Sequence, residues 1–215
     1  MTKERLTSNQ VLQAIKTRII TTEYKPGHIL NESDIAEEFS ISRTPVREVF
    51  KRLETEKYIV LIPRVGAQVA VVDFKFIREC FDLKIALESL CASKAAISEN
   101  KEREIVILES VLERLKTYKG HESYSKIIID DHIFHKTVRA MAGNTLVEEV
   151  LDQYHGHLER LWYLQTNKIQ NVKIFVDTLS EILEAIKAHD SIRAATAAEK
   201  HLQSYIDQVR NELFK

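Results

Sequence analysis

The apolar pattern of this 215-residue chain changes near Asp73. Before that residue, short apolar stretches at helical spacing are followed by two β-branched runs, and beyond it no strand-like alternation persists. Because the chain contains only five glycines and three prolines, long helices are favoured over many short strands. The sequence therefore predicts a mainly α protein with two domains, residues 1–73 and residues 74–215.

The N-terminal part is predicted to contain three helices. The first covers Val11 to Ile20, and the segment Tyr24-Lys25-Pro26-Gly27 behind it reads as a turn. Asn31 and Ser42 are favoured N-cap residues for the next two helices. Pro45 then falls in the first turn of the third helix, where a missing N–H does little harm.

A β-hairpin is expected to follow these helices. Residues 58–62 and 67–72 are apolar, β-branched runs, and Pro63-Arg64-Val65-Gly66 joins them as a basic tip. Three helices and a hairpin predict a winged helix-turn-helix.

Residues 74–215 are expected to form an antiparallel bundle of about six helices, because long amphipathic helices joined by short loops pack in this way. Breaks between the helices are predicted near residues 99–100, 120, 143–144, 167–171 and 189–190.

The third helix has the composition of a DNA-reading element. Arg43, Arg47 and Lys51 are spaced by four and share one face, with Thr44 beside them. Arginine can donate two hydrogen bonds to a guanine edge, while Lys and Thr suit phosphates. Residues 43–64 contain six Lys or Arg against three Asp or Glu, although the whole chain has a formal charge of −1. The alternative is a merely solvated helix face.

The same region shares a longer pattern with a known family, in the segments Tyr24-Lys25-Pro26-Gly27, Leu30-Asn31-Glu32-Ser33-Asp34-Ile35-Ala36 and Ser42-Arg43-Thr44-Pro45-Val46-Arg47-Glu48-Val49, with Leu53. It resembles the winged-helix domain of the GntR family of bacterial transcription regulators. That resemblance implies a homodimer on a palindromic operator in double-stranded DNA. It also implies that Arg43, Thr44 and Arg47 contact bases or adjacent phosphates, that Gly66 enters the minor groove, and that Arg64 contacts a phosphate.

A metal site is one interpretation of three residues in the second part. Asp131 and His135 are four residues apart on one predicted helix, so their side chains converge on one face. His201, on the last predicted helix, offers a third ligand, because a bundle interior brings facing helices together. The alternative is a hydrogen-bonded polar cluster without an ion. His155 and His157 stay unassigned.

The second part resembles the ligand-binding domain of the FadR subfamily of this family, which often holds a divalent metal such as zinc or nickel through one Asp and three His. Asp131-His132-Ile133-Phe134-His135, Ala142-Gly143-Asn144 and His201-Leu202 match its pattern. The remaining ligand position falls at Leu179, in the apolar stripe with Ile182, Leu183 and Ile186. Lys84 stands where many relatives place an arginine that faces the carboxylate of a small organic acid, so the resemblance implies a metabolite-responsive repressor with a changed pocket.

Other observations limit the classes of protein. The chain contains no apolar run long enough to cross a membrane, and its first 24 residues are too charged for a signal peptide. If one helix holds both Cys80 and Cys91, these residues are about 16 Å apart, which is too far for a disulfide bond. Two unpaired cysteines fit a reducing compartment, so a cytoplasmic protein is expected.

Two other classes of function have to be compared with a metabolite-sensing regulator. A metal-dependent bundle enzyme is disfavoured, because neither paired Glu-x-x-His strings nor His-Glu-x-x-His occurs in the sequence. A DNA-binding dimer without any effector stays open.

Overall fold

The computed structural model describes residues 6–118, 124–164 and 172–213. The chain divides into two compact units, and each is described by itself. The first unit contains residues 1–77 together with His155–Leu164, and the second contains Arg78–Tyr154 and Gln165–Lys215.

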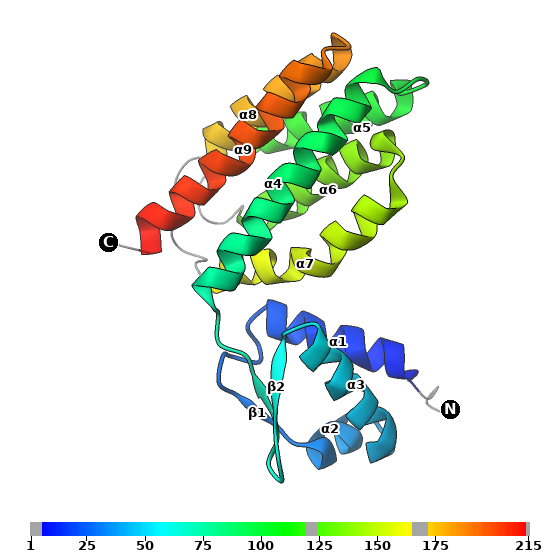
Figure 1. Ribbon diagram of the computed structural model, residues 1–215, viewed down its shortest axis with the longest axis vertical. Coiled ribbons are helices and arrows are strands. Elements are labelled where there is room, and N and C mark those ends of the chain that lie inside the picture. The colour runs from blue at the N-terminus through cyan, green and yellow to red at the C-terminus, as the bar shows by residue number, and fades with distance from the viewer. Residues whose placement is uncertain (1–5, 119–123, 165–171, 214–215) are drawn as a thin grey trace. The chain divides into compact units, whose positions relative to one another are not determined.

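The first unit is a winged helix-turn-helix (Figure 1). Its elements are α1 (Ser8–Ile20), β1 (Ile29–Leu30), α2 (Glu32–Glu38), α3 (Arg43–Thr55), β2 (Ile59–Ile62) and β3 (Gly66–Val69). The strands form an antiparallel sheet in the order β1-β3-β2, with Leu61 opposite Ala67 in the hairpin. Helix α3 contacts α1, α2 and β2, and its buried residues Val49, Phe50 and Leu53 belong to the core of this unit.

Most predicted elements of this unit are present, although the second strand of the hairpin ends at Val69 and not at Val72. Asn31 and Ser42 are the N-cap residues of α2 and α3 as expected, although neither side chain makes a capping hydrogen bond. Helix α1 begins three residues earlier than predicted, at Ser8, because Thr7 and Gln10 form a capping box. The short strand β1 was not predicted, and it extends the hairpin to three strands.

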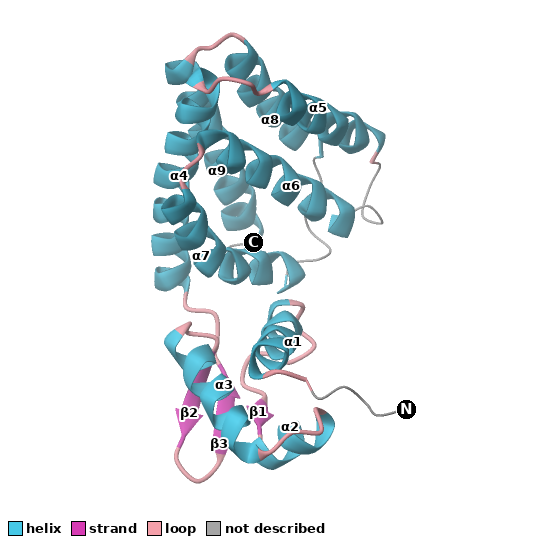
Figure 2. Ribbon diagram, turned by 90° about the vertical axis from the view of Figure 1, so that its right-hand side faces the viewer, coloured by secondary structure: helices cyan, strands magenta, loops and turns pink. Residues whose placement is uncertain are grey.

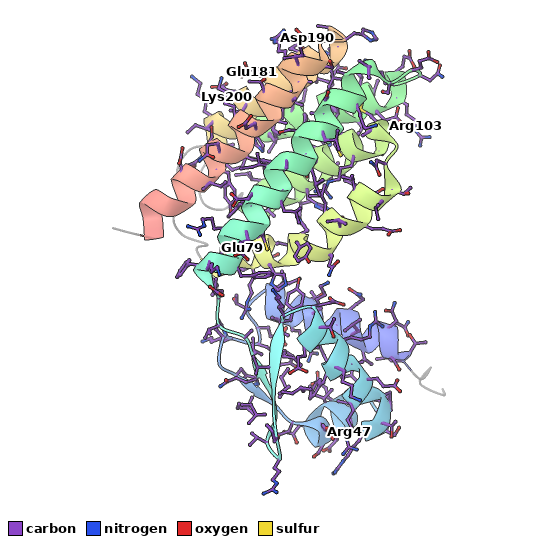
Figure 3. The ribbon with its side chains drawn as sticks, viewed as in Figure 1. Arg47, Glu79, Arg103, Glu181, Asp190 and Lys200 are labelled. Carbon is purple, nitrogen blue, oxygen red and sulfur yellow. The ribbon has the colours of Figure 1, made fainter. Side chains whose placement is uncertain are left out.

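The second unit is an all-helical bundle, seen at the top of Figure 2. It contains most of α4 (Phe74–Ile97) and the first half of α7 (Thr145–Leu164), together with α5 (Glu102–Thr117), α6 (Tyr124–Ala142), α8 (Val172–Lys187) and α9 (Ser191–Leu213). The predicted breaks near residues 99–100, 143–144 and 189–190 lie between helices, whereas those near residues 120 and 167–171 fall outside the described residues. Helix α8 packs along α9, and α5 contacts both α6 and α8. Glu181 of α8 and Lys200 of α9, labelled in Figure 3, form an ion pair of 2.9 Å across that packing.

The apolar stripe of α8 is buried in this bundle. Leu179 is fully buried, and Ile182, Leu183 and Ile186 accompany it in the core. The prediction that residue 179 belongs to the apolar core is therefore confirmed.

Both cysteines lie in α4, where they are buried and form no disulfide bond. Burial raises the pKa of the Cys91 thiol to about 11, so this thiol stays protonated. Among the described residues, none of the helices is both long and apolar enough to cross a lipid bilayer.

Candidate functional site

Helix α3 separates an apolar from a basic face. Val46, Val49, Phe50 and Leu53 are buried, while Arg43, Thr44, Arg47 and Lys51 are exposed. The spacing of four thus places the basic side chains on the solvent side of the helix, as the sequence predicted. Arg47, labelled in Figure 3, leaves 63% of its side chain exposed.

A cleft lies between the start of α3 and the hairpin tip. It encloses about 520 Å³, and its lining includes Arg43 and Arg47 from α3, Arg64 from the tip and Glu32 from α2. The Arg47 Nε donates a hydrogen bond of 2.8 Å to the Glu32 carboxylate. This ion pair restrains the arginine while its other N–H groups remain available for a further acceptor.

Gly66 has a structural reason to be glycine. Its φ is +136°, and a Cβ atom at this position would lie 2.4 Å from the Leu30 carbonyl oxygen. The backbone of β3 therefore approaches β1 closely only because residue 66 has no side chain. Arg64 precedes it in the left-handed region, with a φ of 66°.

The second unit brings the three predicted ligand residues together. One ligand atom from each of Asp131, His135 and His201 lies within 4.8 Å of the others. The distance from the Asp131 Oδ1 to the Nε2 atom is 3.8 Å for His135 and 3.2 Å for His201. Both histidines are 3% exposed, and the Asp131 side chain is 16% exposed, so the cluster is largely buried.

Neighbouring side chains fix which ring nitrogen of each histidine faces the cluster. The Thr178 hydroxyl donates to the Ile174 carbonyl and so accepts from the His201 Nδ1–H, at 2.8 Å. The Glu88 Oε2 lies 3.3 Å from the His135 Nδ1, and its negative charge favours a proton on that nitrogen. The Nε2 atoms of both rings are then left with lone pairs that face the Asp131 carboxylate.

This arrangement suits a cation. The His135 Nε2 is buried and has no hydrogen-bond partner among the described residues. Two imidazole lone pairs and a carboxylate oxygen that converge repel one another unless a proton or a metal ion lies between them. Outer contacts such as those of Glu88 and Thr178 are the usual support for metal-binding histidines. The three residues therefore fit a divalent metal ion.

Protonation in the cluster agrees with this donor set. Burial lowers the pKa of His201, which favours the neutral ring. Burial acts to raise the pKa of Asp131, but His135, His201 and Lys84 outweigh it and hold that pKa below its usual range. The cluster thus presents a carboxylate and a neutral imidazole at neutral pH.

A buried ion pair between Glu88 and Arg139 lies beside His135 and holds Glu88 in place. The Arg139 guanidinium donates to the Glu88 Oε1 through Nε at 3.0 Å and through Nη2 at 2.5 Å, and its Nη1 reaches Asp152 at 3.1 Å. Burial acts to raise the pKa of Glu88, but His135 and Arg139 outweigh it and keep this group ionised. Helices α4, α6 and α7 are joined through this network.

Two parts of the sequence match described protein families. Residues 7–69 match the family described as "Bacterial regulatory proteins, gntR family", and residues 79–204, more than half of the chain, match the FCD domain. The chain belongs to the gntR family of bacterial regulatory proteins. As a member, it is a DNA-binding transcription regulator with an FCD domain, and the family is one of regulators rather than enzymes.

Several relatives of this gntR family member are similar along most of their length. The "Gluconate operon transcriptional repressor" of Bacillus subtilis is 26% identical over 210 residues, which cover 95% of this chain and 86% of that protein. The "HTH-type transcriptional repressor RspR" of Escherichia coli is 23% identical and covers 94% of this chain and 89% of the relative.

Two solved structures share the fold. The E. coli protein McbR/YncC superposes with a TM-score of 0.77 at 20% identity, over 96% of this chain and 98% of that one. A regulator from Rhodococcus sp. RHA1 gives 0.75 at 19% identity, over 95% of this chain and 97% of that one.

Three further residues considered in the sequence are Lys84, His155 and His157. Lys84 of α4 lies close enough to the cluster to lower the pKa of both Asp131 and Glu88. His155 and His157 are outside the cluster. The His155 ring lies 3.7 Å from Glu159, and the buried His157 ring stacks on Tyr58 with centroids 4.1 Å apart.

Sequence reasoning missed the residues that act through the ligands. Glu88, Thr178 and Arg139 come from three helices, and nothing in their spacing along the chain links them to His135 or His201. One signal in the sequence could have revealed Glu88 and Arg139. Both are charged residues within otherwise apolar stretches, and because an unpaired buried charge is costly, this pattern indicates that the two form an ion pair.

Proposed function

We propose that this protein is a homodimeric repressor that binds a palindromic operator and releases it in response to a small molecule. In this proposal residues 1–73 read DNA, and residues 74–215 dimerise and bind the effector. The observation that supports DNA reading is the exposed face of α3, on which Arg43, Thr44, Arg47 and Lys51 project from an apolar core. Relatives named as repressors support the sign of regulation.

The proposed contacts follow the chemistry of each side chain. Arg43 and Arg47 donate to base edges or adjacent phosphates, and Thr44 and Lys51 bind phosphates. Arg64 binds a phosphate beside the wing, and Gly66 lets the wing backbone approach the minor groove. Because this reading of DNA takes place inside a cell, we place the protein in the cytoplasm.

A selection experiment tests the operator proposal directly. The full chain is incubated with a library of randomised duplexes, and the bound duplexes are sequenced after several rounds. A dimer with two α3 helices should recover an inverted repeat whose half-sites are about one helical turn apart. A single, unrepeated motif or no enrichment would contradict it.

The cluster of Asp131, His135 and His201 is proposed to hold a divalent metal such as zinc or nickel. Leu179 offers no donor, so water or an effector carboxylate completes the coordination shell. The bound ion supplies a positive site for an anionic effector, and Lys84 adds a second positive charge nearby. The effector class that fits this pair is a small organic acid.

Sensing is proposed to work by a shift between two dimer arrangements. An effector that binds one arrangement better changes the spacing of the two α3 helices, and hence the fit to the operator. The dimer without an effector remains the competing proposal, because Leu179 and Lys84 both depart from the pattern of metal- and carboxylate-binding relatives.

Thermal unfolding separates these two proposals. Zinc, nickel and small organic acids are added singly and together to the full chain, and any ligand that binds only the folded state raises the melting temperature. His201→Ala and the exposed-site control Lys200→Ala are treated alike. A metal-dependent rise in the wild type and in Lys200→Ala, absent in His201→Ala, supports the sensor. No rise with any ligand supports the dimer without an effector.

A further inference from the structure

The cleft between α3 and the hairpin tip contains a single acidic residue among its described lining residues. This residue is Glu32, and it lies there with Arg43, Arg47 and Arg64. A carboxylate on a surface proposed to face DNA opposes binding, because it repels the phosphate backbone. Glu32 therefore does not serve affinity for DNA in general.

The contact of Glu32 with Arg47 occupies one particular donor of the guanidinium. The Glu32 Oε2 accepts from the Arg47 Nε at 2.8 Å, while 63% of the Arg47 side chain is exposed. The guanidinium is planar and rigid, so a partner that holds Nε also restrains the direction of Nη1 and Nη2. These two terminal groups are the donors that Arg47 offers to a further acceptor.

Two other arginines of the chain show the alternative use of Nε. Arg114 directs its Nε and Nη2 to Asp130 at 2.9 Å and 2.6 Å, and Arg139 directs the same two atoms to Glu88. In this side-on arrangement one acidic partner engages both donors. At Arg47 the hydrogen bond to Glu32 comes from Nε, and the Nη1 and Nη2 pair suits the O6 and N7 acceptors of guanine.

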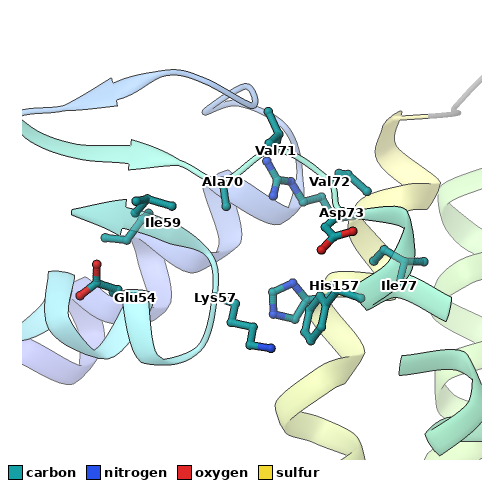
Figure 4. A pocket seen from close by; sticks show the side chains of 12 residues that line it. Glu54, Lys57, Ile59, Ala70, Val71, Val72, Asp73, Ile77 and His157 are labelled. Carbon is teal, nitrogen blue, oxygen red and sulfur yellow. The ribbon is translucent and has the colours of Figure 1, made fainter. Parts of the chain in front are cut away.

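A second acid on the DNA-reading helix has a different kind of partner. Glu54 of α3 lines a separate cavity of about 330 Å³ in the first unit (Figure 4). Its Oε1 accepts from the Leu61 backbone N–H at 2.9 Å and so supports β2. The partner of Glu32 is instead an exposed side chain, so this contact orients a donor and does not join backbone elements.

We propose that Glu32 is a positioning residue that makes Arg47 read a guanine rather than bind a phosphate. With Nε held by Glu32, the guanidinium offers its terminal pair of donors, which fits the guanine edge. A phosphate bound by Arg47 would lie near the Glu32 carboxylate, and this like-charge contact disfavours it. Without Glu32 the Arg47 side chain changes rotamer and donates to the nearest phosphate. This inference rests on the proposed reading of DNA by α3.

The measured quantity is the ratio of affinities for the selected operator and for a scrambled duplex, obtained with the full chain by fluorescence anisotropy. Glu32→Ala should lower this ratio by about tenfold, because a bidentate contact to guanine discriminates by at least that order. Glu32→Gln should keep most of the ratio, since its amide oxygen can still accept from the Arg47 Nε. The control is Asp34→Asn, which removes an equal charge from an exposed acid in the same first turn of α2 and should leave the ratio unchanged.

A double-mutant cycle tests whether Glu32 acts through Arg47. When Glu32→Ala is added to Arg47→Ala, the ratio should fall no further. An equal fall with and without Arg47 would mean that Glu32 contacts a base itself, and this would overturn the proposal. So would an unchanged ratio in Glu32→Ala, or equal losses in Glu32→Ala and either Glu32→Gln or Asp34→Asn. An exposed ion pair adds little to stability, so all variants should fold, which circular dichroism checks.

The duplex selection separates failure of this inference from failure of the proposed function. Wild-type protein that enriches no motif would refute the reading of DNA itself. An inverted repeat that contains a guanine no longer required by Arg47→Ala would support it, and Glu32→Ala should then lose its preference for that same guanine. If Glu32→Ala still selects this guanine, or if no guanine depends on Arg47, only the role of Glu32 is refuted.

Discussion

Arg47 is the residue on which specific DNA recognition is expected to depend most. Its Nε donates to Glu32, and 63% of its side chain remains exposed, so its other N–H groups can donate to DNA. Arg47→Ala removes both the charge and the forked donor pair, so operator affinity should fall by about 1–3 kcal/mol and base preference should relax. Gel-shift titration with the selected operator and with scrambled DNA measures both effects.

The control for this prediction is Arg103→Ala, because Arg103 is also an exposed arginine and lies on α5. It changes the net charge by the same amount and lies outside the first unit. Operator affinity that is unchanged in Arg47→Ala, or reduced equally in both variants, would mean that Arg47 reads no base.

His157 is expected to titrate far below an ordinary histidine. Burial lowers its pKa to about 4, against an ordinary 6.5, and the nearby charges of Lys16 and Arg160 act in the same direction. The Nε2–H donates to the Glu56 carbonyl at 2.8 Å, which partly opposes that shift. An NMR titration of the ring protons measures the pKa, and a value above 6 would contradict this environment.

The lowered pKa of His157 predicts how the stability of the protein changes with pH. Between pH 6.5 and about 4 the unfolded chain binds a proton at His157 that the folded chain does not. The free energy of unfolding therefore falls as the pH is lowered through this window, by roughly 3 kcal/mol in total from this group. Urea unfolding at several pH values should show a smaller acid loss in His157→Gln than in the wild type.

At the scale of single residues, the sequence predicted positions better than contacts. The spacing of Asp131 and His135 was sufficient to place both on one face of a helix, and His201 was correctly assigned to the facing last helix. The contacts that Glu88 and Thr178 make with the two histidines could not be predicted, because helix periodicity does not reveal which residues of different helices meet. The same limit applies to His157 and Arg160, whose burial depends on the fold of the first unit.

The hairpin and its neighbour β1 make a prediction about strand packing. Gly66→Ala places a Cβ 2.4 Å from the Leu30 carbonyl and in a backbone region that L-residues avoid. We expect a loss of about 3 kcal/mol or more in the stability of the first unit, because backbone must move. Thermal unfolding followed by circular dichroism measures it.

Gly27 supplies the matched control. Its φ is +84°, yet a Cβ there would meet no atom within 4 Å. Gly27→Ala therefore carries the conformational penalty alone, about 1–2 kcal/mol. Equal stability of the two variants would show that the contact between β3 and β1 does not require glycine, and that Gly66 matters only for the wing.

Element boundaries show which signals the sequence contained. Helices α2 and α3 begin directly after the predicted N-cap residues, and the described breaks that follow α4, α6 and α8 lie where glycine, asparagine and charged residues cluster. The capping box of Thr7 and Gln10 was visible as a Thr-x-x-Gln string and was overlooked. Strand β1 was not predictable, because two residues show no periodicity and their pairing depends on β3.

For the whole molecule, DNA binding has to arise from a local patch, because the formal charge of the chain is −1. With Arg43 on a phosphate beside a base edge, and Lys51 and Arg64 on two others, each protomer neutralises three phosphates and a dimer six. Counterion release then predicts that the logarithm of operator affinity falls with the logarithm of salt concentration with a slope of about −5. A monomer would give about half that slope.

The salt slope also counts protomers without any knowledge of the operator sequence. Because Arg64→Ala removes one phosphate contact from each bound protomer, the slope should become shallower by about 2 for a dimer and by about 1 for a monomer. Fluorescence anisotropy between 50 and 300 mM salt, roughly the range over which such slopes are measured, provides the value. Lys200→Ala, which removes an exposed cation of the second unit, should leave the slope unchanged. A slope that shifts equally in both variants would mean that DNA is held by the general charge of the protein, and that the first unit does not act as a paired reader.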